Sequence, residues 1–144
     1  MTAVDTNILV YAHRRDSVWH APAVEVIREL AEGAEPWMIP WPCVHEFLAV
    51  VTHPRVYKPA STMNEATRQV DIWMRSPSLM ICGESDTHWS VLCAALRQGK
   101  VAGPQVHDAR IAALCQSLQV TELLSADRDF SRFAGLIVRN PLVR

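Results

Sequence analysis

Four carboxylates occur where acidic side chains are costly to place. Asp5 directly follows an apolar run at the N-terminus, and a second apolar run starts at Ile8. Glu46 lies in a helical segment that is apolar on most sides, and Asp108 lies in the first turn of another. Asp127 follows an apolar, strand-like run. Because a buried carboxylate is unfavourable unless it is paired or bound to metal, this pattern predicts a chemical role for the four acids.

Gathered at one place, these carboxylates would repel one another, and a divalent cation would remove that repulsion. A ligand set made only of carboxylate oxygens selects hard ions, Mg²⁺ or Mn²⁺, over zinc. Such a site activates a water molecule and stabilises the charge that develops during an in-line displacement at phosphorus. The acids therefore favour metal-assisted phosphoryl chemistry.

Each acid also has an ordinary structural explanation. Asp5 is a good helix N-cap residue, and Asp108 is favoured by the dipole of its helix. Glu46 can occupy the narrow polar face of its helix, since glutamate has good helix propensity. A turn explains one of Asp127 and Asp129 easily. The structural explanation accounts less well for four acids that are far apart in sequence and stand mostly at the ends or starts of elements.

Competing catalytic motifs are absent from the sequence. His45 and Glu46 would need a second histidine at position 49 to form a zinc-protease motif, and that residue is alanine. There is no nucleophile elbow, P-loop or G-x-G-x-x-G. His107 is interpreted as a neighbour of Asp108 and not as a ligand. The four cysteines lack C-x-x-C spacing and are interpreted as buried free thiols: Cys43, Cys82, Cys93 and Cys115.

Apolar periodicity predicts strands that alternate with helices. Gly33 is expected to end the helix over 20–32. Asp86 is expected to be the N-cap of a later helix that Gly99 ends. The expected strands cover 1–4, 37–40, 79–82, 120–124 and 136–138. The expected helical segments are one that opens over 8–12, then 20–32, one from Pro42 that ends before Pro54, 62–75, one from Asp86 to Gly99, and 106–118, with a turn or short helical segment over 125–133.

This alternation, joined by short loops, predicts an α/β sandwich with a largely parallel sheet, formed as one domain over residues 1–144. Ligands in such folds bind beyond the carboxyl ends of the strands, where three of the four acids are expected. The proline-containing segment 54–61 has no assigned role beyond a loop that shapes substrate choice.

The composition fits a folded protein that binds metal and phosphate. Hydrophobic residues make up 49% of the 144 residues and charged residues 20%, which supports a packed core. The net charge is −1, so acids gathered around a metal would leave the remaining surface effectively basic. No apolar run is long enough to span a bilayer, and the N-terminus lacks the pattern of a secretory signal, so a cytoplasmic location is expected.

Four stretches resemble the motifs of PIN domains, in order along nearly the whole chain. The stretches are Val4-Asp5-Thr6-Asn7-Ile8-Leu9, Glu46 in its apolar helix, Val106-His107-Asp108-Ala109, and Ser125-Ala126-Asp127-Arg128-Asp129-Phe130 with Phe133, Gly135 and the closing Asn140-Pro141. Size and motif style are similar to those of VapC-type toxins in particular. The resemblance implies a PIN-like three-layer sandwich whose mainly parallel central sheet is flanked by helices.

The resemblance also implies a function. It implies an endoribonuclease that uses Mg²⁺ or Mn²⁺ to hydrolyse RNA phosphodiester bonds, forms homodimers and is neutralised by a VapB-like antitoxin. In this reading Asp5 and Asp108 are the principal metal ligands, while Glu46 and Asp127 bind a second ion or orient water. Supporting hydrogen bonds are expected from Thr6, Asn7 and Ser125, and Asp129 either assists at the site or caps the local turn.

Two alternatives to an RNA-cleaving enzyme stay open at this point. A metal-dependent DNase or nucleotide phosphohydrolase would use the same acids, and a PIN-like module could bind RNA without cutting it. The basic residues are nearly all arginine, a residue that binds phosphate in a bidentate manner. The candidates for phosphate contact are Arg14, Arg15, Arg128 and Arg132.

Overall fold

The computed structural model describes residues 1–143, and residue 144, the last of the expected domain, lies outside the described residues. In chain order the elements are β1 (Thr2–Val4), α1 (Thr6–His13), α2 (His20–Glu32), β2 (Trp37–Pro40), α3 (Trp41–Val51), α4 (Met63–Met74), β3 (Leu79–Cys82), α5 (His88–Gly99), η1 (Gly103–Gln105), α6 (Val106–Ser117), β4 (Glu122–Leu124), η2 (Arg128–Arg132) and β5 (Ile137–Arg139).

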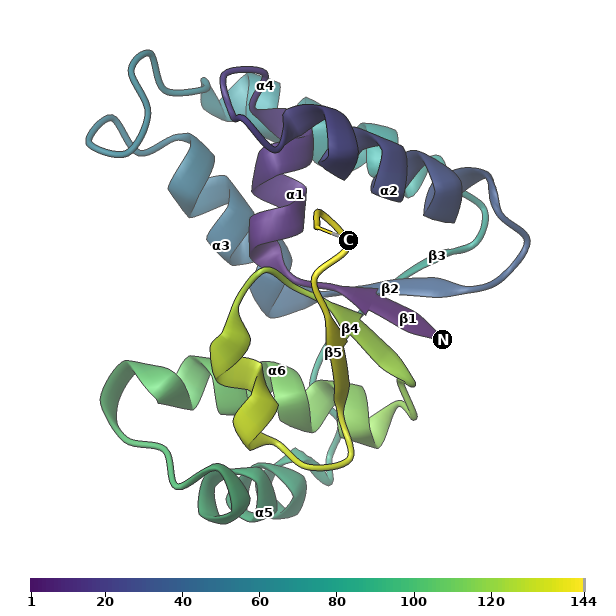
Figure 1. The fold of residues 1–144 in the computed structure, drawn as a ribbon, viewed down its shortest axis with the longest axis vertical. Helices are drawn as coiled ribbons and strands as arrows, with labels where there is room; N and C mark the ends of the chain where they lie inside the picture. Colours follow the sequence, from purple (N-terminus) through teal and green to yellow (C-terminus); the bar gives the residue numbers. More distant parts are fainter. Residues whose placement is uncertain (144) are drawn as a thin grey trace.

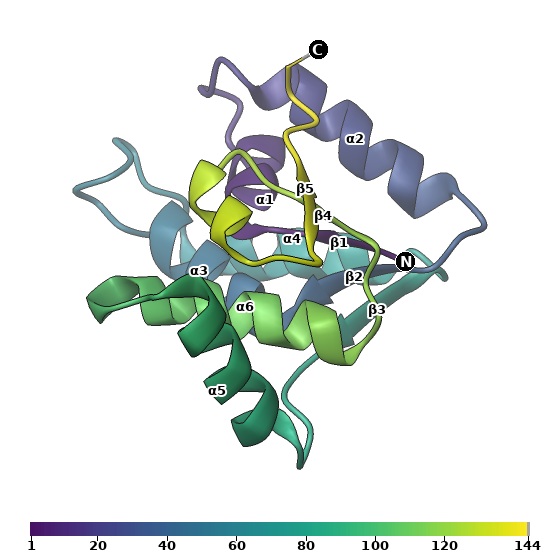
Figure 2. The same ribbon diagram turned by 60° about the horizontal axis from the view of Figure 1, so that its bottom comes forward.

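The five strands form one sheet in the order β3-β2-β1-β4-β5, and every neighbouring pair is parallel. Helices α1, α2 and α4 lie on one side of the sheet, and α5 and α6 lie on the other (Figures 1 and 2). The expected α/β sandwich with a mainly parallel central sheet is therefore confirmed. Its central strands, β1 and β4, bring their carboxyl ends to the same edge.

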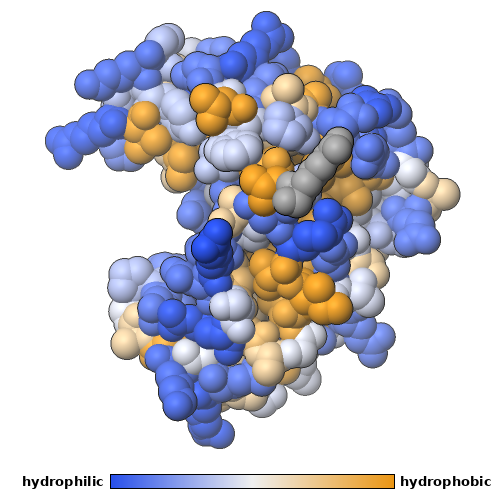
Figure 3. Space-filling model, viewed as in Figure 1, coloured by the Kyte–Doolittle hydropathy of each residue, from blue (hydrophilic) through white to orange (hydrophobic). Residues whose placement is uncertain are grey.

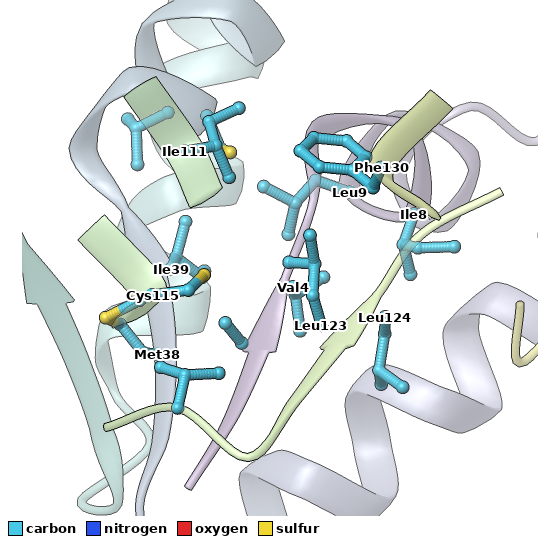
Figure 4. Close-up of a cluster of buried hydrophobic side chains, with 14 of the residues drawn as sticks. Val4, Ile8, Leu9, Met38, Ile39, Ile111, Cys115, Leu123, Leu124 and Phe130 are labelled. Carbon is cyan, nitrogen blue, oxygen red and sulfur yellow. The ribbon is translucent and has the colours of Figure 1, made fainter. Parts of the chain in front are cut away.

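Strands β1, β2 and β4 are apolar because helices cover both faces of the sheet. Their side chains pack with residues from α1, α6 and η2 into one core, which is drawn in Figure 4. Val4, Leu123 and Leu124 are almost completely buried there, as are Ile111 and Cys115 from α6. This core fixes the strand ends on which the acids are carried.

Two expectations about the ends of helix α5 are wrong. Asp86 is not the N-cap of α5, because the helix begins at His88 and Thr87 precedes it in the cap position. Gly99 does not stop α5 but is its last residue, and Lys100 takes the left-handed conformation with a φ of 49°. Gly99 is needed for another reason: a Cβ atom there would lie 2.6 Å from Cε1 of Phe133.

The four cysteines are free thiols, as expected, but the expected burial holds for only two of them: Cys43 and Cys115 are buried, whereas Cys82 and Cys93 are half-buried. Thr62 caps α4 in a reciprocal pair of hydrogen bonds with Glu65. Within residues 1–143, no helix has the length and apolar character that crossing a bilayer requires.

Candidate active site

The candidate site forms where β1 and β4 end. Asp5 follows β1 directly, and its backbone N–H donates a hydrogen bond to the carbonyl of Leu124 at 3.0 Å. Ser125 follows β4, so the segment that carries Asp127 starts beside Asp5. Glu46 comes from α3 and Asp108 from the first turn of α6. The four predicted acids all line one cleft of about 240 Å³.

Asp5 is held by four hydrogen-bond donors at the floor of this cleft. Its Oδ1 accepts from the Thr6 N–H at 2.8 Å and from the Cys43 thiol at 3.6 Å. Its Oδ2 accepts from the Ser125 hydroxyl at 2.7 Å and from the Asn7 amide at 3.3 Å. Asp5 is 5% exposed and is the N-cap of α1, so the capping explanation is correct, while its carboxylate also lines the cleft. The orientation of its carboxylate is fixed.

The three expected supporting residues connect the acids to one another. The Thr6 hydroxyl donates to Oε2 of Glu46 at 3.0 Å. The Ser125 Oγ accepts the backbone N–H of Asp127 at 3.0 Å while it donates to Asp5. Asn7 joins both chain segments, because its amide also donates to the Ser125 Oγ at 3.2 Å. One hydrogen-bonded network therefore extends from Glu46 through Asp5 to Asp127.

Asp129 is brought close to two of the acids. Carboxylate oxygens of Asp108, Asp127 and Asp129 lie within 4.8 Å of one another, a spacing at which one metal ion can be held. The turn at η2 is capped by Asp127, whose Oδ1 accepts the Asp129 N–H at 2.9 Å. Of the two roles considered for Asp129, its carboxylate position fits the one at the site, and the capping role belongs to Asp127.

The electrostatics of the cleft favour a bound cation. Burial, and after it the nearby charges of Asp127, Asp5, Asp129 and Glu46, together raise the pKa of Asp108 from 3.8 to about 6. Burial also raises the pKa of Asp5, against the hydrogen bonds from Ser125 and Thr6 that lower it. Ionised carboxylates are thus crowded where water is partly excluded. The donor set fits Mg²⁺ or Mn²⁺, since all its ligand atoms are carboxylate oxygens.

A larger hollow of about 670 Å³ continues from the acidic cleft and shares Glu46 and Asp108 with it. His45, His107 and Arg110 also line this hollow. The acids therefore stand between two connected depressions. Figure 3 shows the molecule deeply notched on this side, between the part that carries α3 with segment 52–62 and the part that carries α6 with η2.

The predicted arginines differ in their availability. The Arg14 guanidinium is held by Asp16 at 2.7 Å and 2.9 Å and by the Ser61 hydroxyl at 3.2 Å. Arg132 donates to the Asp129 carbonyl at 3.2 Å. Arg15 and Arg128 are exposed. Of the four, Arg15 and Arg128 are therefore the side chains most open to solvent.

Three residues at the site were not singled out from the sequence. Cys43 lies three residues before Glu46, and Tyr11 lies four residues after Asn7, so helical spacing could have placed both on the site's side of their helices. Tyr57 also lines the cleft. It comes from the segment between α3 and α4, where no periodicity gives a signal.

The PIN domain family model matches residues 2–136. Ribonuclease VapC43 of Mycobacterium tuberculosis (strain H37Rv) is 34% identical over 142 residues, which cover 99% of this chain and 96% of the relative. Ribonuclease VapC48 of the same strain is 28% identical over 95% of this chain and 94% of its own length. A crystal structure of VapBC2 from Rickettsia felis has a TM-score of 0.69 at 19% identity and covers 96% of each chain.

Proposed function

Because this chain belongs to the PIN-domain family, we propose that it is a metal-dependent endoribonuclease and the toxin of a VapBC-type toxin–antitoxin pair. The observation that carries the enzymatic part is the single cleft that gathers Asp5, Glu46, Asp108 and Asp127 from four separate parts of the chain. We also propose that the protein acts in the cytoplasm, as expected from the sequence.

Asp108, Asp127 and Asp129 are the side chains whose oxygens can share one Mg²⁺ or Mn²⁺. Asp5, expected to be a principal ligand together with Asp108, is not part of this close group but lines the same cleft as Asp108 and Asp127 and adds negative charge there. When bound, the ion would lower the pKa of a water molecule that it binds and would stabilise the charge that develops on the phosphate. Thr6 fixes Oε2 of Glu46, so Oε1 of Glu46 is the atom we assign to orient the attacking water. Asp5 is restrained by its four donors and keeps the acidic cleft in one geometry.

The choice of RNA is tested with matched RNA and DNA strands of one sequence, each supplied with Mg²⁺ or Mn²⁺. The protein is first unfolded and refolded, so that no co-purified antitoxin occupies the cleft. We expect the RNA to be cut internally and the DNA to stay intact. Preferential cutting of DNA would instead identify a DNase, and binding with unchanged RNA length would identify a binding module.

The toxin assignment rests on the VapC names of the relatives and on the VapBC complex among the structural neighbours. An apolar hollow of about 550 Å³ between α2 and α4 supports a protein partner, because Val24 and Ile72 are 39% and 46% exposed there. We expect induction of the protein alone to arrest growth of its host and co-expression of the antitoxin encoded beside it to restore growth. Unaffected growth would contradict the toxin role.

We also propose that the protein is a homodimer, as the family resemblance implies. Light scattering of the purified protein, coupled to size exclusion, measures this directly. A mass of twice 16.2 kDa is expected. A mass that stays at the monomer value over a wide concentration range would contradict the proposal.

A further inference from the structure

The acidic cleft has an aromatic side that metal chemistry does not use. Tyr11 from α1 and Tyr57 from segment 52–62 line the same cleft as the four acids. Both side chains are half-buried. Tyr11 follows Asn7 by four residues, which places it one turn along the same side of α1. Two phenol rings therefore face the space in which a substrate meets the acids.

The Tyr57 ring is held in place before any ligand binds. The guanidinium carbon of Arg14 lies 4.3 Å from the centre of the ring, a cation–π contact. Arg14 is itself fixed by Asp16 and Ser61. The backbone N–H of Tyr57 donates to the carbonyl of His53 at 3.1 Å. A ring fixed in this way loses little conformational entropy when a second flat group packs against it.

The surroundings of Tyr57 show which side of the ring is available. Arg14 lines a neighbouring hollow of about 620 Å³ together with Arg15 and Arg68, and Tyr57 does not line that hollow. Tyr57 lines the acidic cleft, and Arg14 does not. Tyr57 thus contacts Arg14 and also lines the acidic cleft, which Arg14 does not reach. The part of the ring that Arg14 leaves uncovered is therefore the part available to a substrate.

We propose that Tyr57, with Tyr11 beside it, is a stacking platform for one RNA base in the nucleotide next to the scissile phosphate. This inference deepens the proposed function and rests on it. The cleft, at about 240 Å³, is smaller than the roughly 300 to 1,000 Å³ of a typical small-molecule site, so it takes a phosphate and one base. The rest of the strand continues into the 670 Å³ hollow on the other side of Glu46 and Asp108.

Stacking on an aromatic side chain tolerates every base, because each base has a π-face. The subsite therefore requires a base to be present and unpaired, while the identity of that base matters less. A base paired inside a helix cannot turn onto the Tyr57 ring, so only an unpaired base can occupy this subsite. This requirement gives segment 54–61, which carries the ring, a role in substrate choice.

The test is a scan with abasic nucleotides. The cleavage site is mapped first, and a short RNA containing it is then made with one base removed at each position in turn. For the wild-type protein, loss of the base at the stacked position should lower kcat/KM roughly 5- to 150-fold, the range that stacking energies imply. For Tyr57→Ala, the same removal should have no further effect. Tyr57→Phe keeps the ring and should behave like the wild type.

Val56→Ala is the matched control, because Val56 is the preceding residue, is 54% exposed and does not line the cleft. It should show the wild-type pattern. An abasic penalty that is the same in the wild type and in Tyr57→Ala would overturn the stacking platform. Cleavage that tolerates base removal at every position would overturn it as well.

A binding measurement separates this inference from the nuclease itself. RNA carrying 2-aminopurine at each position in turn is titrated with Asp108→Asn, a variant expected to bind without cutting. Stacking predicts that the fluorescence of 2-aminopurine is quenched at one position and that this quenching disappears when Tyr57→Ala is combined with Asp108→Asn. This result would support stacking even if the wild-type protein cleaves no RNA. If the wild type cleaves RNA but Tyr57→Ala leaves the quenching unchanged, the proposed nuclease function stands and the stacking platform is refuted.

Discussion

Removing one carboxylate from the cleft should stabilise the metal-free protein while it abolishes the activity. Asp108 has a pKa raised from 3.8 to about 6, first by burial and then by the charges of Asp127, Asp5, Asp129 and Glu46. Near pH 7 without metal, the ionised side chain is therefore less favourable in the folded protein than in the unfolded chain. Asp108→Asn keeps the shape of the side chain and removes the charge.

The size of the effect follows from this pKa. A rise from 3.8 to about 6 corresponds to at most about 3 kcal/mol of lost stability at neutral pH. Asp108 is only partly buried, so solvent screening reduces this upper limit to about 1 kcal/mol. For a chain of this length, that difference corresponds to a rise in Tm of roughly 3 °C.

The assay is thermal and urea unfolding of both proteins in chelator, from pH 4 to pH 8. Between pH 4 and pH 6 the folded wild type binds more protons at Asp108 than the unfolded chain does, so its stability should fall as the pH rises through this window. Asp108→Asn should lack this part of the decline. A variant that is less stable than the wild type at pH 7 without metal would refute the argument from crowded charge.

Three further predictions concern the metal, the packing and the orientation of Asp5. Added Mn²⁺ should stabilise the wild type by an amount that grows with the logarithm of the Mn²⁺ concentration above Kd and reaches about 3 kcal/mol at a hundredfold excess, and its Tm should rise accordingly. The Tm of Asp108→Asn should barely change, and equal shifts in both proteins would contradict the proposed ligands. Gly99→Ala should lower the free energy of unfolding by about 1–3 kcal/mol in urea, because the new Cβ would lie 2.6 Å from the Phe133 ring; an unchanged value would mean that the ring moves freely. Cys43→Val should weaken the Mn²⁺-induced shift and Cys43→Ser should preserve it, because only serine can still donate to Asp5; matching shifts would show that the thiol has no orienting role.

The sequence predicted the architecture well because its signals are local. Apolar strands bounded by turn residues and helices with a clear buried stripe gave the order of elements, including the exact bounds of α2, β2 and β3. The errors lie at the ends of elements. The strands expected over 120–124 and 136–138 span Glu122–Leu124 and Ile137–Arg139, and two helix ends also differ from the expectation. Asp86 is as good a cap residue as Thr87, and Gly99 marks a close contact with Phe133 that depends on the tertiary structure.

The acids could be predicted for the same reason, since each breaks an apolar pattern. Their approach at the strand ends was expected too, but the close spacing of Asp108, Asp127 and Asp129 could not be predicted, because it depends on how η2 turns after β4. The contacts of Arg14 with Asp16, Ser61 and the Tyr57 ring could not be predicted either. Ser61 and Tyr57 reach Arg14 only through the packing of segment 52–62. Local patterns thus identified the four acids that line the cleft and missed its aromatic side.

The most direct test of the nuclease is cleavage of a structured RNA pool by the refolded wild type, Asp5→Asn and Asp108→Asn, with Mg²⁺ or Mn²⁺ and with chelator. The account predicts internal cutting by the wild type only when metal is present, and a loss of at least about a hundredfold in both variants, as expected when a group that stabilises transition-state charge is removed. Cutting that persists in chelator, or variants that cut as fast as the wild type, would contradict the claim that the acidic cleft is the catalytic centre.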